Sequence, residues 1–243
     1  MRRLLPDPAD DVDLVAAYAY PSRRRWLRGN MIESADGAAT LDGHAGGLGN
    51  PTDQRVLGLL RALSDVVIAG AGTVVTEGYG PARAREEYQA LRAEAGQPPA
   101  PVMAVVSNQL RLDFSSRYFA EARERPIVVT CQAAPPDLLR AAHEAADVIV
   151  AGAQVVDPAL MVDALADRGL TRLLCEGGPS FLGSTVAAGV LDELCLTISP
   201  MLVGGPARRV LDGPVISPPA PMRLTQLLID DDDLLYARYE VRR

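Results

Sequence analysis

Residues 65–73, which read DVVIAGAGT, decide the fold of this chain. A continuous apolar run, Val66–Ala69, passes directly into glycines at positions 70 and 72. A strand that is apolar on both sides is typical of a parallel sheet covered by helices on both faces. Glycine directly after such a strand favours a tight strand-to-helix turn that brings backbone N–H groups close to a ligand.

The same pattern recurs on either side of this stretch. Further buried strands are expected at 102–107 (VMAVVS), 127–130 (IVVT), 148–151 (VIVA) and 172–175 (RLLC). Helices are expected between the strands, at 51–63, 84–95, 136–146 and 158–168. The helix at 51–63 has Asn50 as its N-cap and Pro51 in its first turn. Strands that alternate with helices predict an α/β fold with a mainly parallel sheet.

The C-terminal part of the chain follows a different rule. Strands are expected at 194–199, 224–229 and 234–241, and no helix separates the last two. Four aspartates at 230–233 join this pair, and we interpret them as a solvated turn of an antiparallel hairpin at an exposed sheet edge. A first strand is expected at 26–34 (WLRGNMIES). We therefore predict one domain over 26–243, preceded by an N-terminal extension over 1–25.

Composition excludes several classes of protein. All 24 basic residues of the 243-residue chain are Arg, which excludes a Schiff-base lysine and a Walker-A loop. The net charge of −7 disfavours nucleic-acid binding, and the short basic run at 23–25 is typical of solvated surface. The N-terminus has no apolar region like that of a signal peptide, and no apolar run approaches the ~20 residues of a membrane helix.

Cysteine and histidine are too few and too scattered for a metal site. Cys131, Cys175 and Cys195 have no C-x-x-C spacing, which favours reduced, buried thiols in a cytoplasmic protein. His44 and His143 are the only histidines, so a His-based metal site or a Ser-His-Asp triad has few candidate members. No metal site is predicted.

A second glycine turn follows the strand at 172–175. Residues 176–181 read EGGPSF, so two glycines precede a helix that Pro179 opens. Each turn alone is weak evidence, but two on neighbouring strands suit the two sides of a dinucleotide pyrophosphate. Neither turn matches the G-x-G-x-x-G fingerprint with its following acid, so a Rossmann fold is not predicted. The third candidate, Gly152, is weaker.

Four segments make the sequence similar to a known family. They are NMIESADG (30–37), LRALSDVVIAGAGT (60–73), EGGPSFLG (176–183) and LDELCLTISPMLVGG (191–205). Over residues 26–240 the chain resembles the reductase (C-terminal) domain of the bacterial bifunctional riboflavin-biosynthesis deaminase/reductase, and more narrowly the free-standing actinobacterial pyrimidine reductases. This resemblance implies a dihydrofolate-reductase-like fold, whereas the zinc-binding deaminase domain is absent.

The resemblance also implies NADPH as the cofactor. The residues expected to bind it are Gly70, Ala71, Gly72, Thr73, Ser107, Thr130, Gly152, Gly177, Gly178, Pro179, Ser180 and Phe181. Ser107 and Thr130 end two strands, near where the related fold holds the adenosine 2′-phosphate. An equally good interpretation makes them plain strand-end hydroxyls.

Four polar residues are the candidates on the substrate side. They are Asn30, Asp53, Glu77 and Glu176. Asn30 stands where the bifunctional enzymes carry a Lys, and it could pair with a heterocycle edge or satisfy backbone groups. Asp53 could accept hydrogen bonds from ring N–H groups or simply complement the helix dipole. Glu77 could deliver a proton, and Glu176 could orient the substrate or the nicotinamide.

The resemblance implies a reductase of 5-amino-6-(5-phosphoribosylamino)uracil in riboflavin biosynthesis, and a homodimer. Two departures affect the substrate: Ala45 replaces a family Ser, and the phosphate-binding stretch after the first glycine turn reads EGYGPAR (77–83). Arg83 or Arg85 could take the phosphate instead. Two alternatives remain, namely reduction of dihydrofolate or another pterin, and a non-catalytic NADPH-binding protein.

Overall fold

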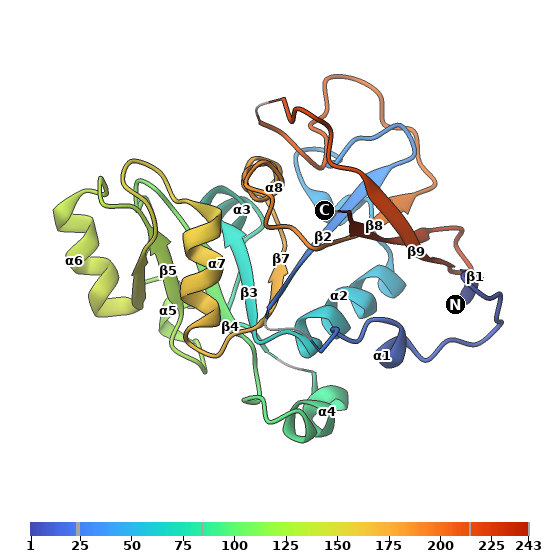
Figure 1. Cartoon of the computed structure of the whole chain (residues 1–243), viewed down its shortest axis with the longest axis horizontal. Coiled ribbons are helices and arrows are strands. Elements are labelled where there is room, and N and C mark those ends of the chain that lie inside the picture. The colour runs from blue at the N-terminus through green and yellow to red at the C-terminus, as the bar shows by residue number, and fades with distance from the viewer. Residues whose placement is uncertain (23–24, 84, 214, 243) are drawn as a thin grey trace.

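The computed structural model describes residues 1–22, 25–83, 85–213 and 215–242. Its centre is a ten-stranded sheet with the order β1-β9-β10-β8-β2-β7-β3-β4-β5-β6. The strands are β1 (Arg2–Leu5), β2 (Trp26–Ser34), β3 (Val66–Gly70), β4 (Val102–Val106), β5 (Ile127–Thr130), β6 (Asp147–Val150), β7 (Arg172–Cys175), β8 (Glu193–Ser199), β9 (Met222–Ile229) and β10 (Leu235–Val241). Figure 1 shows how they follow one another across the molecule.

Helices connect and flank these strands. They are α1 (Leu14–Ala17), α2 (Pro51–Leu63), α3 (Ala71–Thr76), α4 (Gln89–Glu94), α5 (Arg117–Ala120), α6 (Pro136–Ala145), α7 (Pro158–Ala166) and α8 (Pro179–Ala187). Short 3₁₀ turns cover Ala45–Gly47 and Glu86–Tyr88. The helix expected over 84–95 is thus a 3₁₀ turn followed by the six-residue α4, and residue 84 lies outside the described residues.

The sheet has the mixed pattern that the sequence predicts. In the sheet order β8-β2-β7-β3-β4-β5-β6, every neighbouring pair of strands is parallel. β10 runs antiparallel between β8 and β9. The prediction of a mainly parallel α/β sheet with an antiparallel C-terminal hairpin is confirmed.

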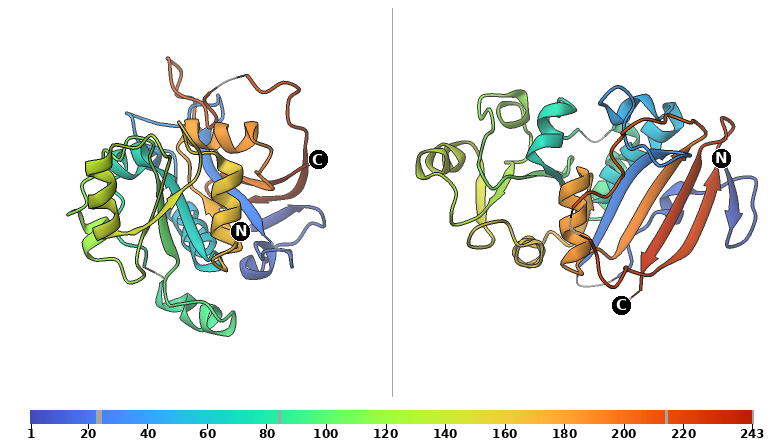
Figure 2. Two further views of the ribbon diagram at one scale, coloured as in Figure 1. Left: turned by 60° about the vertical axis from the view of Figure 1, so that its left-hand side comes forward. Right: turned by 90° about the horizontal axis from the view of Figure 1, so that it is seen from above.

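Both faces of the parallel part are covered. On β3, Val67 and Ala69 belong to one core cluster, whereas Val66 and Ile68 belong to another. The first cluster includes apolar side chains of α2, and the second includes those of α7 and α8. Viewed from above, α2 and α3 lie on one side of the sheet and α7 and α8 on the other (Figure 2). The alternation of a period-2 strand explains why the run 66–69 is apolar throughout.

Two expectations about the C-terminal hairpin are corrected. Its outer strand β9 is not a free edge, because β1 pairs with it antiparallel, so the N-terminal extension supplies the edge strand. Asp230 is not a solvated turn residue, because it is only 4% exposed and accepts several hydrogen bonds. The other three aspartates of the turn are exposed, as expected.

The structure also places the cysteines and Arg25 of the basic run. The three cysteines are free and buried. Arg25 pairs with Asp163, whereas positions 23 and 24 of the basic run lie outside the described residues. Within the described ranges, no helix has both the length and the apolar character needed to cross a bilayer.

Candidate active site

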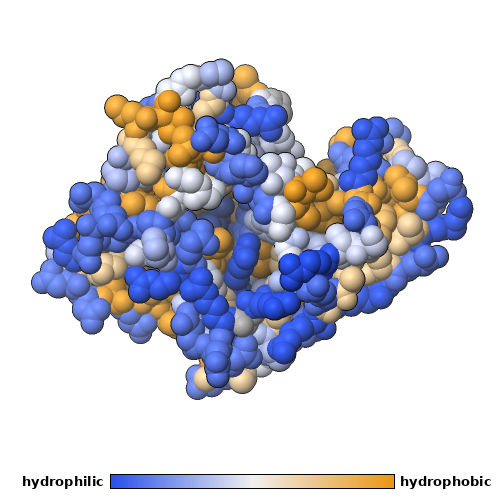
Figure 3. All heavy atoms as spheres, turned by 180° about the vertical axis from the view of Figure 1, so that it is seen from behind, coloured by the Kyte–Doolittle hydropathy of each residue, from blue (hydrophilic) through white to orange (hydrophobic). Residues whose placement is uncertain are grey.

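A cavity of about 460 Å³ opens beside the C-terminal ends of the parallel strands. Its walls come from β2, the pocket side of α2, the segment after α3, residues 39–46 and the start of α8. That volume suits a small organic ligand. The space-filling view from behind shows a largely hydrophilic face that is hollowed near its centre (Figure 3).

The two glycine turns touch one another at this edge of the sheet. The Gly70 N–H donates to the Gly177 carbonyl oxygen at 2.8 Å. A Cβ on Gly178 would come within 2.5 Å of the Thr73 hydroxyl oxygen, so a larger residue there would have to displace Thr73. No side chain caps α8, whose N-cap is Gly178, so its first N–H groups remain available to an anion.

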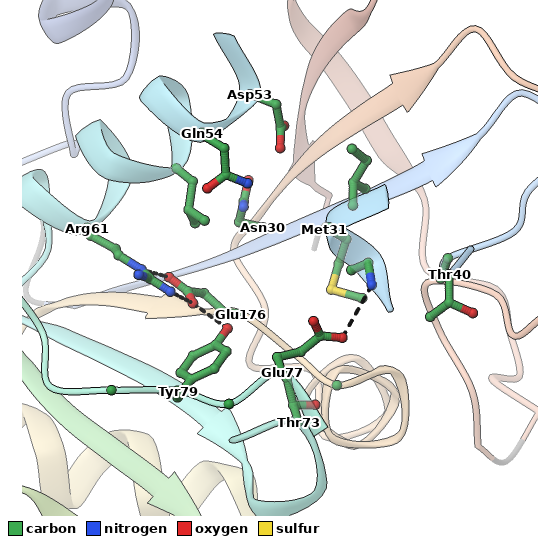
Figure 4. Close-up of a pocket in the computed structure, with 18 of the residues that line it drawn as sticks. Asn30, Met31, Thr40, Asp53, Gln54, Arg61, Thr73, Glu77, Tyr79 and Glu176 are labelled. Carbon is green, nitrogen blue, oxygen red and sulfur yellow. Dashed lines mark hydrogen bonds and ion pairs between the residues drawn. The ribbon is translucent and has the colours of Figure 1, made fainter. Parts of the chain in front are cut away.

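Glu176 lies at the centre of a buried ion-pair network. Its carboxylate accepts two hydrogen bonds from Arg61 and one from the Tyr79 hydroxyl, each at 2.6 Å. Figure 4 shows Arg61 reaching this carboxylate from α2 and Tyr79 reaching it from the segment after α3. Burial alone would lower the pKa of Arg61, but the adjoining carboxylate outweighs it and the pKa is raised. Burial, together with Glu176, raises the pKa of the Tyr79 hydroxyl.

Asp53 is a half-buried carboxyl at the other end of the cavity. It lies in the first turn of α2, and its Oδ1 accepts a hydrogen bond from the Thr197 hydroxyl at 2.9 Å. Burial is the main cause that raises the pKa of Asp53, and the charge of Asp230 adds to it. A carboxyl with a raised pKa in a cavity is a candidate proton carrier.

Asn30 and Glu77 complete the polar lining that the sequence predicts. Asn30 is half-buried on β2 and lines the cavity between Asp53 and Glu176 (Figure 4). Glu77 lies just after α3, and its Oε1 accepts a hydrogen bond from the Ala45 N–H at 3.3 Å. All four substrate-side candidates therefore line one cavity, although they come from separate elements.

The candidates for cofactor binding fall into two groups. Thr73, Gly178 and Pro179 line the cavity, and the rest of the two turns adjoins it: Gly70, Ala71, Gly72, Gly177, Ser180 and Phe181. The second group lies away from the cavity, farther along the same sheet edge, and consists of Ser107, Thr130 and Gly152. The Thr130 hydroxyl is buried and has no hydrogen-bond partner among the described residues.

Ser107 and Gly152 both have local structural roles. The Ser107 hydroxyl accepts a hydrogen bond from the Leu110 N–H at 2.9 Å. Gly152 has a φ of +113°, and a Cβ there would meet the Val155 carbonyl oxygen at 2.2 Å. The turn after β6 therefore needs glycine for its own geometry.

Sequence reasoning missed several residues of the cavity wall. The most important are Arg61 and Tyr79, which hold Glu176, together with Gln54 and Leu57 on α2. The spacing 54, 57, 61 places three side chains on one face of a helix, and this signal was available. Nothing in the sequence shows that this face meets Glu176, which is 115 residues from Arg61.

Neither arginine considered for a substrate phosphate lies in the cavity wall. Arg83 is exposed and pairs with Glu121 at 3.3 Å. Arg85 donates to the Gln54 carbonyl oxygen at 3.1 Å and pairs with Glu87. Among the described residues that line the cavity, Arg61 is the one cation. The described residues also contain no group of His, Cys, Asp or Glu placed to hold a metal ion.

Comparison with known proteins gives a family match over most of the chain. The RibD C-terminal domain family matches residues 25–236. The 2,5-diamino-6-ribosylamino-4(3H)-pyrimidinone 5′-phosphate reductase of Methanothermobacter thermautotrophicus is 30% identical over 184 residues, which are 75% of this chain and 78% of that protein. The reductase of the same name from Archaeoglobus fulgidus is 28% identical over 153 residues, or 63% and 69% of the two chains.

Similarity to a solved structure covers nearly the whole chain. The crystal structure of a pyrimidine reductase-like protein from Corynebacterium diphtheriae superposes with a TM-score of 0.84 at 30% identity, covering 96% of this chain and all of that one. The family resemblance predicted from four sequence segments is thereby confirmed. With a family match over most of its length and a fold shared end to end, this chain belongs to the RibD C-terminal domain family.

Proposed function

We propose that the protein is an NADPH-dependent reductase of a phosphoribosylaminopyrimidine in riboflavin biosynthesis. The observation that carries the proposal is the convergence of Asn30, Asp53, Glu77 and Glu176 on one cavity that adjoins two glycine turns. The related archaeal reductases take a pyrimidinone that bears a ribosylamino 5′-phosphate group. Family membership supports the reaction class, and the cavity supplies the polar groups that a pyrimidine ring requires.

The residues at the sheet edge fit a dinucleotide. The cradle at Gly178 leaves no room for a Cβ unless Thr73 moves, α8 begins without a side-chain cap, and Thr130 has a buried hydroxyl with no partner among the described residues. The pyrophosphate would lie against the two glycine turns, and Ser107 and Thr130 would lie near the adenosine end. Bound NADPH supplies a hydride to a C=N-type carbon of the substrate.

The side chains of the cavity would bind the substrate, orient it and supply the proton that its reduction requires. Asn30 offers a donor and an acceptor to the ring edge. Asp53, with its raised pKa, can hold a proton and pass it to the nitrogen of the C=N bond that is reduced. Glu176 is held by Arg61 and Tyr79, so it can orient a neighbouring amide without moving. Glu77 at the cavity mouth is a second candidate proton donor.

A pterin reductase is the second candidate function. Arg61 already donates two hydrogen bonds to Glu176, so the one cation of the described cavity wall is occupied. Asp53, Glu77 and Glu176 make the wall acidic, which suits an amino-substituted ring better than a phosphate. A protein that binds NADPH without turnover is not favoured, because the named relatives are reductases.

One assay separates these candidates. NADPH oxidation is followed with the diaminopyrimidinone 5′-phosphate, with its uracil counterpart and with dihydrofolate. We expect turnover with a phosphoribosylaminopyrimidine. Turnover with dihydrofolate alone would support the pterin reductase, and tight NADPH binding with no turnover on any of the three would support the binding protein.

We also propose that the protein is a homodimer. β9 and the segment before it keep apolar side chains exposed, notably Leu202, Val215, Met222 and Leu224. Met222 and Leu224 lie two residues apart on β9 and so share one side of it, and exposed apolar side chains that lie together favour association. Light scattering should give twice the 25.8-kDa mass of the chain, and a mass of one chain at micromolar concentration would contradict the proposal.

A further inference from the structure

The aspartate turn between β9 and β10 is joined to the wall of the cavity. The Asn50 amide donates to the Asp230 carboxylate at 2.9 Å and to the Asp232 carboxylate at 2.8 Å. Asn50 is the N-cap of α2, the helix that carries Asp53. A turn at residue 230 therefore contacts the helix that begins at residue 51.

Both ends of the Asn50 side chain are used. Its amide nitrogen reaches the turn, while its Oδ1 accepts a hydrogen bond from the Asp53 N–H at 2.9 Å. A side chain held at both ends has one orientation, and that orientation fixes the start of α2 relative to the hairpin.

The Asp53 carboxylate is confined on two sides. The Thr197 hydroxyl on β8 donates to its Oδ1 at 2.9 Å. On the other side, a Cβ on Gly49 would come within 2.7 Å of its Oδ2, so the carboxylate lies close against the backbone at Gly49. Small shifts of the helix start would therefore move this carboxylate within the cavity.

Asp230 is itself firmly held. The Tyr236 hydroxyl donates to its Oδ2 at 2.9 Å, and the N–H groups of Asp232 and Leu234 donate to its Oδ1, each at 3.0 Å. Burial opposes ionisation of Asp230, but these hydrogen bonds and the one from Asn50 lower its pKa overall. A fixed negative charge therefore stands behind the start of α2.

We propose that Asn50 and Asp230 are positioning residues that hold the Asp53 carboxylate in place in the substrate cavity and keep it next to a fixed negative charge. The catalytic part of this inference rests on the proposed function, because only there does Asp53 face a substrate. The hairpin turn, far from the cavity in sequence, thus acts on the site through one asparagine.

The electrostatic surroundings of Asp53 are simple. Burial is the larger cause of its raised pKa, Asp230 adds to it through its charge, and the Thr197 hydrogen bond opposes both. Tyr236 on β10 also interacts with Asp53 through its charge. The pKa of Tyr236 is raised, mainly by burial and next by Asp230. Neutralising Asp230 should therefore lower the pKa of Asp53.

The first test measures the protonation of Asp53 without any reaction. The ¹³C signal of its carboxyl, assigned by its loss in Asp53→Asn, is titrated in the wild type, in Asp230→Asn and in Asp231→Asn. Asp231 is exposed in the same turn and makes no contact with Asn50, so it is the matched control. We expect Asp230→Asn to lower the Asp53 pKa and Asp231→Asn to leave it unchanged. If Asp230→Asn does not fold, the second test, on Asn50→Ser, decides the proposal.

The second test separates positioning from helix capping. Serine caps helices as well as asparagine does, but its side chain is too short to reach the turn as well. We expect Asn50→Ser to keep α2 capped, to lower the urea midpoint because the hydrogen bonds to Asp230 and Asp232 are lost, and to raise KM about fivefold or more. Wild-type KM in Asn50→Ser, or an unchanged Asp53 pKa in Asp230→Asn, would overturn the proposal.

The two tests keep this inference apart from the proposed function. The titration gives a result even if the protein reduces no pyrimidine. It therefore still tests the contact between Asp230 and Asp53 if the proposed function is wrong. Conversely, the Asp53 pKa could be the same in Asp230→Asn as in the wild type while the wild type reduces the pyrimidine. That result would overturn the positioning role and leave the reductase proposal standing. In that case, Asn50 would act on Asp53 only as the N-cap of α2.

Discussion

At the scale of single residues, Asp53 and Asn30 set the charge and the proton-carrying capacity of the cavity wall. Asp53 is half-buried, accepts one side-chain hydrogen bond and has a raised pKa. Asn30 lies where the bifunctional relatives are expected to carry a positive charge. Because the chain has no Lys and Arg61 is bound to Glu176, the cavity wall carries little positive charge of its own.

Asp53→Asn should abolish most of the turnover and stabilise the fold. The amide keeps an acceptor for Thr197 but cannot carry the proton, so we expect kcat to fall about 10²-fold. The folded pKa lies above the unfolded one, so the contribution of Asp53 to stability is full at low pH and is lost as pH rises through the folded pKa.

Urea unfolding at several pH values checks this prediction. At neutral pH the variant should unfold at a higher urea concentration than the wild type, and the difference should shrink toward acid pH. A variant that is less stable than the wild type at neutral pH would contradict the burial of a charged Asp53. The exposed Asp231→Asn serves as the control for a plain loss of one negative charge.

At the scale of elements, α2 is the part of the fold that organises the site. Its N-terminus carries Asp53, and Arg61 lies two turns farther along. The other end is held by Arg92 of α4, which donates to the carbonyl oxygens of Ala62 and Ser64, both at 2.8 Å. Both ends of the helix are thus fixed by side chains from distant segments, which keeps its cavity face in register with the sheet.

The network of Arg61, Tyr79 and Glu176 joins α2, the segment after α3 and the end of β7. Glu176→Gln removes the charge that Arg61 requires, so we expect a loss of about 2 kcal/mol in unfolding free energy, moderated because Arg61 is partly exposed. Tyr79→Phe removes one hydrogen bond and should cost about 1 kcal/mol. Urea denaturation compares the two, and a smaller loss in Glu176→Gln than in Tyr79→Phe would show that Arg61 does not depend on this charge.

At the scale of the whole molecule, the candidate cofactor and substrate sites share one edge of the sheet. The glycine turns follow β3 and β7 (Figure 1), and the cavity lies between them and α2 (Figure 4). On the far side of β2, the strands β8, β10, β9 and β1 extend the sheet away from the glycine turns. A ligand at this edge would contact both parts of the sheet and stabilise the molecule as a unit.

NADPH should therefore raise the melting temperature of the whole protein in one transition. At a concentration of about 100 Kd, linkage gives about 2.7 kcal/mol, which corresponds to a rise of about 5–10 °C for a chain of this length. Differential scanning fluorimetry with NADPH, with NADH and without nucleotide measures it. We expect a smaller shift with NADH, and equal shifts would exclude a dedicated site for the 2′-phosphate.

The strands other than β1, the glycine turns and the first turn of α2 could be predicted from the sequence alone. These features are local: an apolar run such as 66–69 requires cover on both faces, and Asn50 followed by Pro51 starts a helix with neighbouring groups alone. The parallel order of the sheet follows from the alternation of such strands with helices. The four segments that carry the family resemblance lie in these same local features.

Only the tertiary structure decided which distant side chains meet. Arg61 and Glu176 are 115 residues apart, and Asn50 and Asp230 are 180 apart, so no local pattern could pair them. The burial of Asp230 and the pairing of β1 with β9 were predicted wrongly or missed for the same reason. A charged turn or a short strand looks solvated until the rest of the chain folds over it, because burial depends on neighbours and not on sequence position.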